Sequence, residues 1–427
     1  MILRGEGDGH ARTPLNRDAR PSGRAASPGP RGPRLAETWE NTVTSTVMPE
    51  PRAADPTAAL DTVVDDVIDP GRRRGGRDRD LPPRGRRGPR RRGRLGLLGA
   101  PDARGLADAA RVVERLAGAC GSTAMVVLMH YAAAAVLEAH GPDDVRRAIA
   151  AGEHLVTLAF SESGSRSHFW APVGTATADG SAVRLDARKS FVTSAGEADG
   201  LVWSSRPLAA PGPMTLWYVP SGASGLTVDG PFDGLGLRGN ASSPVTADGV
   251  RVPPGAMLGA DGAGLDIALG TALPPFLVLS AAFSLGVMES LMDSARDRMT
   301  RTRFEHIGRT PADDPGARAA YARLRIRVDE TRAFLADTLA ALDTGRADAT
   351  LRVLQVKAVA AEAAAEVADG ELRLCGGSAF RRGGGVERRF RDALASRVMA
   401  PTTEALHDFV ARAGLGLPLF GEENPCC

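Results

Sequence analysis

The stretch RLCGGSAFRRGGGVERRFRDA, residues 373–393, lies between a long helical pattern and a second, charged one. Its paired glycines, Gly376 and Gly377, carry no side chains, so the backbone can approach a pyrophosphate closely and offer bare N–H donors. The regular run VERRFRDA (386–393) follows the glycines. A flexible Gly-rich linker alone does not explain such a run. We therefore interpret the stretch as an ordered glycine turn that joins two helices.

Helical periodicity continues on the N-terminal side of this turn. Residues 314–343 and 347–374 are two long helical segments, and SLGVMESLMDSARDRM (284–299) repeats apolar residues at intervals of three and four. Short connections between these segments imply antiparallel packing. We predict a four-helix bundle over residues 261–421.

The middle of the chain has a different character. Between residues 155 and 260, short runs such as LVTLAF (155–160) and MTLWYVP (214–220) are rich in β-type residues and are separated by Gly, Pro, Asp and Ser. This pattern predicts a small all-β domain, either a barrel or a sandwich. Residues 105–152 look helical, and residues 96–154 read as a truncated N-terminal helical domain. The predicted fold class is therefore α+β, with a helical N-terminal part, a central small β-barrel domain and a C-terminal four-helix bundle.

The two ends of the chain lack such patterns. Residues 1–95 are rich in Pro, Gly and Arg, which is typical of a disordered tail, and residues 422–427 form a second tail. Residues 71–94 hold twelve Arg and two Asp, whereas the whole chain has a net charge of only +2, so the remaining residues are net acidic. A basic arm could contact nucleic acid or anionic lipid, but no aromatic residues interleave the arginines. The acidic folded part argues against a nucleic-acid-binding body.

The cysteines and the longest apolar run exclude further classes. The four cysteines are Cys120, Cys375, Cys426 and Cys427. None belongs to a CxxC pair, so the sequence predicts neither a zinc site nor a disulfide framework and favours the reducing cytoplasm. Residues 267–288 carry no charge and are long enough to span a bilayer. Two prolines interrupt this run and an amphipathic segment follows, so we interpret it as a buried helix and expect neither a metal nor a membrane partner.

The order of these parts, together with four local motifs, resembles the acyl-CoA dehydrogenase family of flavoproteins over about residues 95–421. The turn at 373–393 is similar to the family's Gln-x-x-Gly-Gly-x-Gly-Tyr…Val-Glu-Arg-x-x-Arg-Asp-Ala. AFSESGSRSH (159–168) is similar to its Thr-Glu-Pro-Gly-x-Gly-Ser-Asp loop, and RKSFVTSAG (188–196) to its Lys-x-Trp-Ile-Thr-Asn-Gly strand. RTRF (301–304) ends a helix, as the family's Arg-x-x-Phe does.

The resemblance implies that FAD binds between the β-domain and the bundle of a homo-oligomer, a dimer or a tetramer, whose subunits share cofactor sites. Phe191 would pack on the flavin, Thr193 would hydrogen-bond near its N5 atom, and Arg301 would pair with a phosphate across the subunit interface. Glu387, Arg391 and Asp392 would be structural. The implied cofactor-binding residues are Ser161, Ser167, Phe191, Thr193, Arg301, Phe304, Arg373, Gly376, Gly377, Thr402 and Glu404.

The expected catalytic carboxylate is missing. An acyl-CoA dehydrogenase removes the α-proton of a thioester, and a buried carboxylate with a raised pKa suits that task. The resemblance places this carboxylate at Ala400 or, as in some relatives, at Phe276, and neither residue can take a proton. Glu404 lies one helical turn beyond Ala400 and faces either the site or solvent.

His130 is the catalytic candidate that the remaining sequence offers. It is the titratable residue of the apolar helical stretch AMVVLMH (124–130), which would border the substrate cavity. A histidine on an apolar face is more often a satisfied core residue. His168 and His407 are weaker candidates, because both are expected to be exposed.

We therefore expect an FAD-dependent oxidoreductase that acts on CH–CH groups and oxidises an acyl thioester carried by CoA or an acyl-carrier protein. An electron-transfer flavoprotein is the expected electron acceptor. Two alternatives stay open. A two-component flavin monooxygenase has the same fold, lacks the carboxylate and takes reduced FMN or FAD from a flavin reductase. A non-catalytic flavin- or acyl-binding protein would also tolerate the altered motifs.

Overall fold

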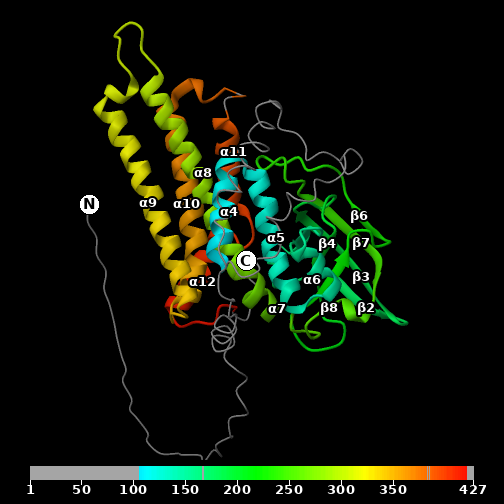
Figure 1. Ribbon diagram of the computed structural model, residues 1–427. Helices are drawn as coiled ribbons and strands as arrows, with labels where there is room; N and C mark the ends of the chain where they lie inside the picture. The colour runs from blue at the N-terminus through cyan, green and yellow to red at the C-terminus, as the bar shows by residue number, and fades with distance from the viewer. Residues whose placement is uncertain (1–104, 166–167, 382, 384, 421–427) are drawn as a thin grey trace, which may run out of the picture. The chain divides into compact units, whose positions relative to one another are not determined.

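The computed structural model describes residues 105–165, 168–381, 383 and 385–420 (Figure 1). In this part of the chain, helices come first, strands follow, and long helices complete the fold. The fold class is α+β, which confirms the prediction. The predicted tails, residues 96–104 and Ser167 lie outside the described residues.

Three helices open the described chain: α4 (Gly105–Ala119), α5 (Gly121–His140) and α6 (Asp143–Ala150). The apolar stripe of α4 is buried against α8, the first long helix of the bundle. Gly286 of α8 permits this contact, because a Cβ atom there would lie 2.0 Å from the carbonyl oxygen of Glu114. Helix α5 is apolar on nearly all sides and packs against both α8 and strand β1 (Val156–Ala159).

The strands form two four-stranded sheets. The first has the order β1, β4 (Gly200–Ser205), β5 (Thr215–Pro220) and β8 (Met257–Leu258), with β1 and β4 parallel. The second has the order β2 (Thr175–Asp179), β3 (Ala182–Val192), β7 (Ser243–Val252) and β6 (Leu226–Val228), with antiparallel pairing throughout.

One apolar core joins the two sheets. Trp203 and Trp217 of the first sheet are fully buried with Leu185 and Val250 of the second. The strand pairing of the described residues therefore gives two packed sheets, which is the sandwich form of the small all-β domain predicted as a barrel or a sandwich.

The bundle begins with a short turn of helix, α7 (Gly264–Ile267), and a π-helical turn over Ala268–Ala272. The long helices are α8 (Leu273–Arg301), α9 (Pro315–Asp343), α10 (Ala349–Cys375), α11 (Val386–Val398) and α12 (Thr403–Gly414). Helices α9 and α10 correspond closely to the segments expected at 314–343 and 347–374. Helix α8 packs against α4, α9 and α10 and is buried over most of its length.

Two described helical stretches, Gly121–His140 and Gly264–Arg301, are long and apolar enough to cross a bilayer by length and composition. In the second stretch, 83% of the apolar window is buried inside the protein. A core helix has this property, and this burial agrees with the interpretation of residues 267–288 as a buried helix.

The arrangement places α5 between the strands and the bundle (Figure 1). The N-terminal end of α8 and the junction between α11 and α12 face the same region as the ends of β1 and β3. The functional site lies at this boundary.

Candidate functional site

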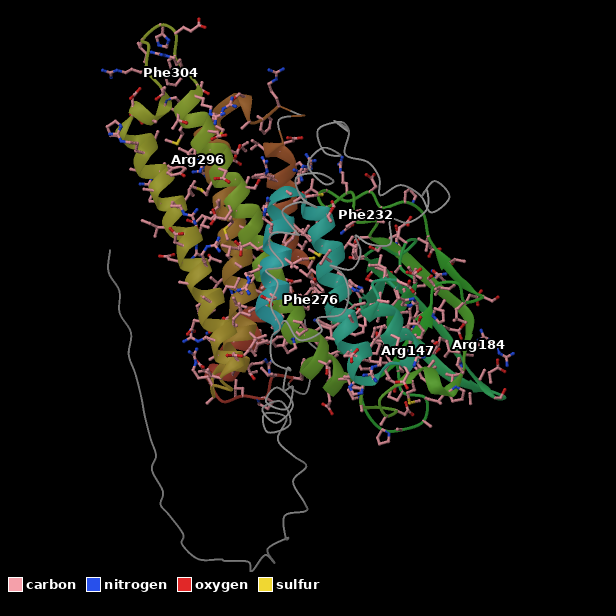
Figure 2. All side chains as sticks on the ribbon, viewed as in Figure 1. Arg147, Arg184, Phe232, Phe276, Arg296 and Phe304 are labelled. Carbon is pink, nitrogen blue, oxygen red and sulfur yellow. The ribbon has the colours of Figure 1, made fainter. Side chains whose placement is uncertain are left out.

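A cleft of about 1140 Å³ opens between the strands and the helices. Apolar side chains form most of its walls, and hydroxyl groups and main-chain atoms are placed among them. Figure 2 shows Phe276 on the helical side and Phe232 on the strand side of the molecule; both line the cleft. A concave apolar site with a few polar groups is the usual form of a small-molecule or cofactor site.

The two β-domain motifs meet at this cleft. The N–H of Ser190 donates to the carbonyl oxygen of Ser161 at 2.9 Å, so the stretches 159–168 and 188–196 run together. Ser161, Phe191 and Thr193 line the cleft. The hydroxyls of Thr193 and Ser242 are hydrogen-bonded at 3.1 Å, and the ring of Phe191 is 71% exposed. An aromatic ring this exposed beside an apolar cleft is well placed to cover a planar ligand.

A buried ion pair supports the floor of the cleft. The ammonium of Lys189 donates to Glu162 Oε1 at 2.5 Å and to the main-chain oxygen of Ser204 at 2.7 Å. The other carboxylate oxygen accepts from the N–H groups of Val173 and Gly174 at 2.6 and 2.8 Å. Burial lowers the pKa of Lys189 to about 8, and the Glu162 carboxylate opposes that shift. Glu162 also lines the cleft, so this pair connects the core of the β-domain to the site.

The loop between β6 and β7 forms a second wall, which the sequence analysis did not identify. Among the described residues, three non-glycine residues have positive φ values of 50° to 56°, namely Ser194, Leu237 and Ala241, and all three lie at this wall or beside it. The N–H of Ser194 donates to the carbonyl oxygen of Asn240 at 2.9 Å, and that of Leu237 donates to Asp392 Oδ1 at 2.7 Å. Such backbone conformations cost about 1–3 kcal/mol each and tend to gather at functional sites.

The charged residues of α11 differ in position: two make structural contacts, and one lines the cleft. Asp392 is buried, holds the Leu237 N–H and lies 3.5 Å from the guanidinium of Arg388. Glu387 accepts from the N–H of Gly383 at 3.3 Å. These contacts agree with the structural roles expected for Asp392 and Glu387. Arg391, also expected to be structural, lines the cleft.

Both positions at which the resemblance expects a catalytic carboxylate face the cleft. Ala400, in the connection between α11 and α12, and Phe276, in the first turn of α8, are lining residues. Two carboxylates belong to the described lining, Glu162 and Glu404. Because Glu162 is engaged in the buried ion pair, Glu404 is the carboxylate of this lining that is not held in an ion pair.

Glu404 is exposed and lies in the first turn of α12. Hydrogen bonds from its own main-chain N–H and from the Thr402 hydroxyl hold the pKa of Glu404 below its usual range. Such a carboxylate is a weak proton acceptor. Thr402 itself caps α12 by accepting from the N–H of Ala405 at 3.3 Å and is not among the lining residues.

His130 is a core residue in this structure. Its side chain is 1% exposed, and its Nδ1 atom accepts a hydrogen bond from the N–H of Val156 at 3.2 Å. The ring thus joins α5 to β1, and the neighbouring Met129 lines the cleft instead. This placement favours the core role over the catalytic one. His168 is exposed and stacks on Trp170, with the ring centroids 4.7 Å apart.

The end of α8 lies away from the cleft of its own chain. Arg301 is largely exposed and lies 3.7 Å from the carboxylate of Asp297. Phe304 is 41% exposed, and Figure 2 shows it at the tip of the hairpin between α8 and α9, far from Phe276. Neither Arg301 nor Phe304 therefore contributes to the cleft that Ser161 and Thr193 line.

The glycine turn lies beside the end of α8. Gly376 and Gly377 are exposed in a single 3₁₀ turn after α10, and Arg373 pairs with Asp369 at 2.6 Å at the protein surface. Arg298 donates from Nε to the carbonyl oxygen of Cys375 at 3.2 Å, so its guanidinium lies next to this turn. Arg298 lies outside the Arg-x-x-Phe spacing, which begins at Arg301, so the motif did not indicate this contact.

Gly376 has φ of 63° and ψ of −160°, a region that glycine alone adopts readily. Replacing Gly376 by alanine is expected to lower the free energy of unfolding by about 1–3 kcal/mol. Gly377 has no positive φ, and replacing it by alanine is the matched control. Urea unfolding of both variants checks the prediction, which is wrong if the two substitutions have equal effects.

Two family models match the chain. The model described as acyl-CoA dehydrogenase, middle domain, matches residues 157–250, and that described as acyl-CoA dehydrogenase, C-terminal domain, matches residues 262–415. Together they account for more than half of the chain.

Curated proteins and solved structures agree with these matches. The chain is 25% identical to isobutyryl-CoA dehydrogenase, mitochondrial, of Dictyostelium discoideum over 316 residues, which are 71% of this chain and 74% of that protein. It is 28% identical to L-prolyl-[peptidyl-carrier protein] dehydrogenase of Pseudomonas fluorescens over 273 residues, 63% of this chain and 70% of that one. A structure titled PigA with FAD and proline aligns with a TM-score of 0.74 at 17% identity, covering 87% of this chain and 100% of that chain.

Proposed function

Because the chain belongs to the acyl-CoA dehydrogenase family of FAD-dependent oxidoreductases, which act on CH–CH groups, we propose that it oxidises an acyl thioester in the cleft between its sheets and its helices. One observation carries the proposal. Ala400 and Phe276, the two positions of the family's carboxylate, line the same cleft as Ser161 and Thr193 from the two flavin motifs. Residues from four separate stretches of chain thus meet where the proposed substrate and cofactor would react.

The residues present fit the ring-bearing end of FAD. Thr193 and Ser161 provide hydroxyl groups at the strand ends, and Phe191 provides an exposed aromatic face. The volume of the cleft leaves room for an acyl group beside a flavin. Bound FAD would accept a hydride from the substrate, and the protein would bind, orient and enclose the reacting groups.

The apolar side chains that line the cleft favour a substrate with an apolar acyl group. Met129, Leu273 and Phe276 present apolar side chains to the cleft from α5 and α8. They would exclude water from the reacting carbon atoms and strengthen the polar contacts that remain. The carrier of the acyl group is CoA or a carrier protein; the similarity to a peptidyl-carrier-protein dehydrogenase supports including carrier-bound substrates.

A second copy of the chain would complete the cofactor site. Gly376, Gly377 and Arg301 lie at the surface, away from the cleft of their own chain. If they contact the phosphates of FAD, as the family motifs imply, they must do so from a partner subunit. We therefore include a homo-oligomer, a dimer or a tetramer, in the proposal, with an electron-transfer flavoprotein as the acceptor of the electrons.

A two-component flavin monooxygenase is the second candidate. Its reaction requires no carboxylate to take an α-proton, and neither Ala400 nor Phe276 supplies one. This candidate would bind the same flavin ring in the same cleft. It would differ in receiving reduced FMN or FAD from a separate reductase.

Anaerobic titration separates these functions. The FAD-loaded protein is mixed with acyl thioesters of several chain lengths, carried by CoA or by a phosphopantetheinylated carrier protein. We expect at least one thioester to bleach the oxidised flavin absorbance. If none does, but reduced flavin and oxygen support hydroxylation of an added substrate, the monooxygenase function replaces the proposal. A protein that takes up no FAD would be a non-catalytic member of the family.

A further inference from the structure

The chain uses lysine at two positions only, Lys189 and Lys357, although it has 53 lysine and arginine residues in total. Both lysine side chains are fully buried, with an exposed fraction of 0%. The lysine ammonium is compact and can be enclosed by several acceptors, whereas the larger planar guanidinium of arginine needs a wider site. Lys189 supports the floor of the cleft. The contacts of Lys357 indicate a corresponding role at the wall.

Lys357 projects from α10 toward the connection between α11 and α12. Its Nζ atom donates to the carbonyl oxygen of Met399 at 2.8 Å and to that of Pro401 at 2.6 Å. These two residues flank Ala400, and Met399, Ala400 and Pro401 all line the cleft. Lys357 is not a lining residue. Its ammonium therefore holds the three-residue segment 399–401, the wall segment, from α10 without itself lining the cleft.

This contact also orients a peptide group. The C=O of Met399 and the N–H of Ala400 belong to one planar peptide unit and point in opposite directions. Because the C=O points to Lys357, the Ala400 N–H points away from α10. It makes no main-chain hydrogen bond to another described residue.

A second contact from α10 anchors the residue at the end of α11. Arg397 forms two hydrogen bonds with Glu362, both of 2.9 Å, and Arg397 also lines the cleft. The wall segment is thus tied to α10 at its N-terminal approach, through Arg397, and at both of its ends, through Lys357. A short connection between two helices would otherwise be among the more mobile parts of the fold.

We propose that Lys357 is a positioning residue: by holding the carbonyl oxygens on both sides of Ala400, it sets the orientation of the wall segment toward the bound acyl thioester. This inference rests on the proposed function, because it assigns a substrate to the cleft. The geometry predicts that removing the ammonium loosens the wall segment without unfolding the bundle. It also predicts a slower reaction in a site that still binds FAD.

The test compares the wild-type protein with the K357M variant, which keeps an unbranched side chain of similar length and removes the donors. We expect hydrogen exchange in peptides covering residues 395–406 to become at least about tenfold faster, because the variant removes the donor to both carbonyl oxygens of the wall segment. Exchange in α9 should stay within about twofold. The limiting rate of flavin bleaching by a thioester should fall about tenfold or more, with the Kd for FAD changed by less than about twofold.

The control is E289Q. Glu289 accepts from Arg325 at 2.7 and 2.9 Å and from Arg332 at 2.8 Å, and it lies outside the cleft lining. This variant should lower the stability of the bundle and leave exchange at residues 395–406 and the bleaching rate unchanged. If Lys357 had only a structural role, K357M would behave like E289Q: the stability of the bundle would fall, and exchange at residues 395–406 and the bleaching rate would not change.

The outcomes are distinguishable. Unchanged exchange at residues 395–406 in K357M overturns the inference, whether or not any thioester reduces the flavin. Faster local exchange with an unchanged bleaching rate overturns it as well, because the wall segment would then not position the substrate. A wild-type flavin that no thioester bleaches counts against the proposed function, while the exchange measurement still decides whether Lys357 holds the wall.

Discussion

Replacing Ala400 by glutamate is expected to raise the rate of flavin reduction by a saturated acyl thioester by about two to four orders of magnitude, the usual contribution of a positioned general base. Ala400 lines the cleft, and no carboxylate of the described lining lies at either family position. A glutamate there would stand among apolar walls, which raise the pKa of a carboxylate toward the range in which a base is effective. The wall segment held by Lys357 would fix its direction.

The A400Q variant is the matched control for this experiment. It has the same shape as the glutamate variant but cannot accept the proton at neutral pH. The measurement is the limiting rate of flavin bleaching in anaerobic stopped-flow experiments at saturating thioester. Equal rates in A400E and A400Q would show that the cleft does not present the substrate α-carbon to residue 400. In that case F276E, at the alternative position on α8, is the next variant to test.

Removing the ammonium of Lys189 is expected to have the largest effect on stability. In the K189M variant, Glu162 would remain buried with no cationic partner, although its other oxygen would still accept from the N–H groups of Val173 and Gly174. Breaking a buried ion pair by removing one partner costs about 3–5 kcal/mol. Domains are commonly stable by about 5–15 kcal/mol, so this variant should lose a large part of its stability. Urea unfolding followed by tryptophan fluorescence measures the change, because Trp203 lies 4.9 Å from the ammonium.

The double variant E162Q/K189M tests whether the unpaired carboxylate of Glu162 causes the loss of stability in K189M. Glutamine can still accept the two main-chain hydrogen bonds without bringing a charge into the core. If the loss in K189M arises from an unpaired carboxylate, the double variant should recover more than half of the lost stability. The affinity for FAD should fall in K189M and recover in part in the double variant, because Glu162 and Ser161 belong to the same stretch and both line the cleft. A K189M protein as stable as the wild type would show that the carboxylate becomes protonated at little cost.

Much of the fold could be predicted because its signals are local. Helices α9 and α10 begin and end close to the expected residues, since apolar spacing and the flanking Gly, Pro and Asp residues act within a few positions of each boundary. The stretches 159–168 and 188–196 were also identified from adjacent residues, and each supplies lining residues to the cleft. Motif spacing indicated that they belong together.

Residues that act through partners far along the chain could not be identified in this way. The loop around Leu237 becomes a wall because its N–H binds Asp392, 155 residues later. The role of His130 was left open by the sequence, because an apolar helix face next to a cavity and one in the core have the same pattern. The structure distinguishes these two cases, because the His130 side chain is buried and accepts a hydrogen bond from the N–H of Val156.

The sequence by itself determined the family, the order of helices and strands, the family positions of the two flavin motifs and the lack of a carboxylate at Ala400 and Phe276. These are properties of residue identity and short-range spacing. The tertiary structure alone decided that the strands pair into two sheets, that Ala400 and Phe276 share one cleft, and that both lysine side chains are buried. Burial and hydrogen-bond partners arise from contacts between distant segments, and the free energy of those contacts depends on the whole fold rather than on any one stretch.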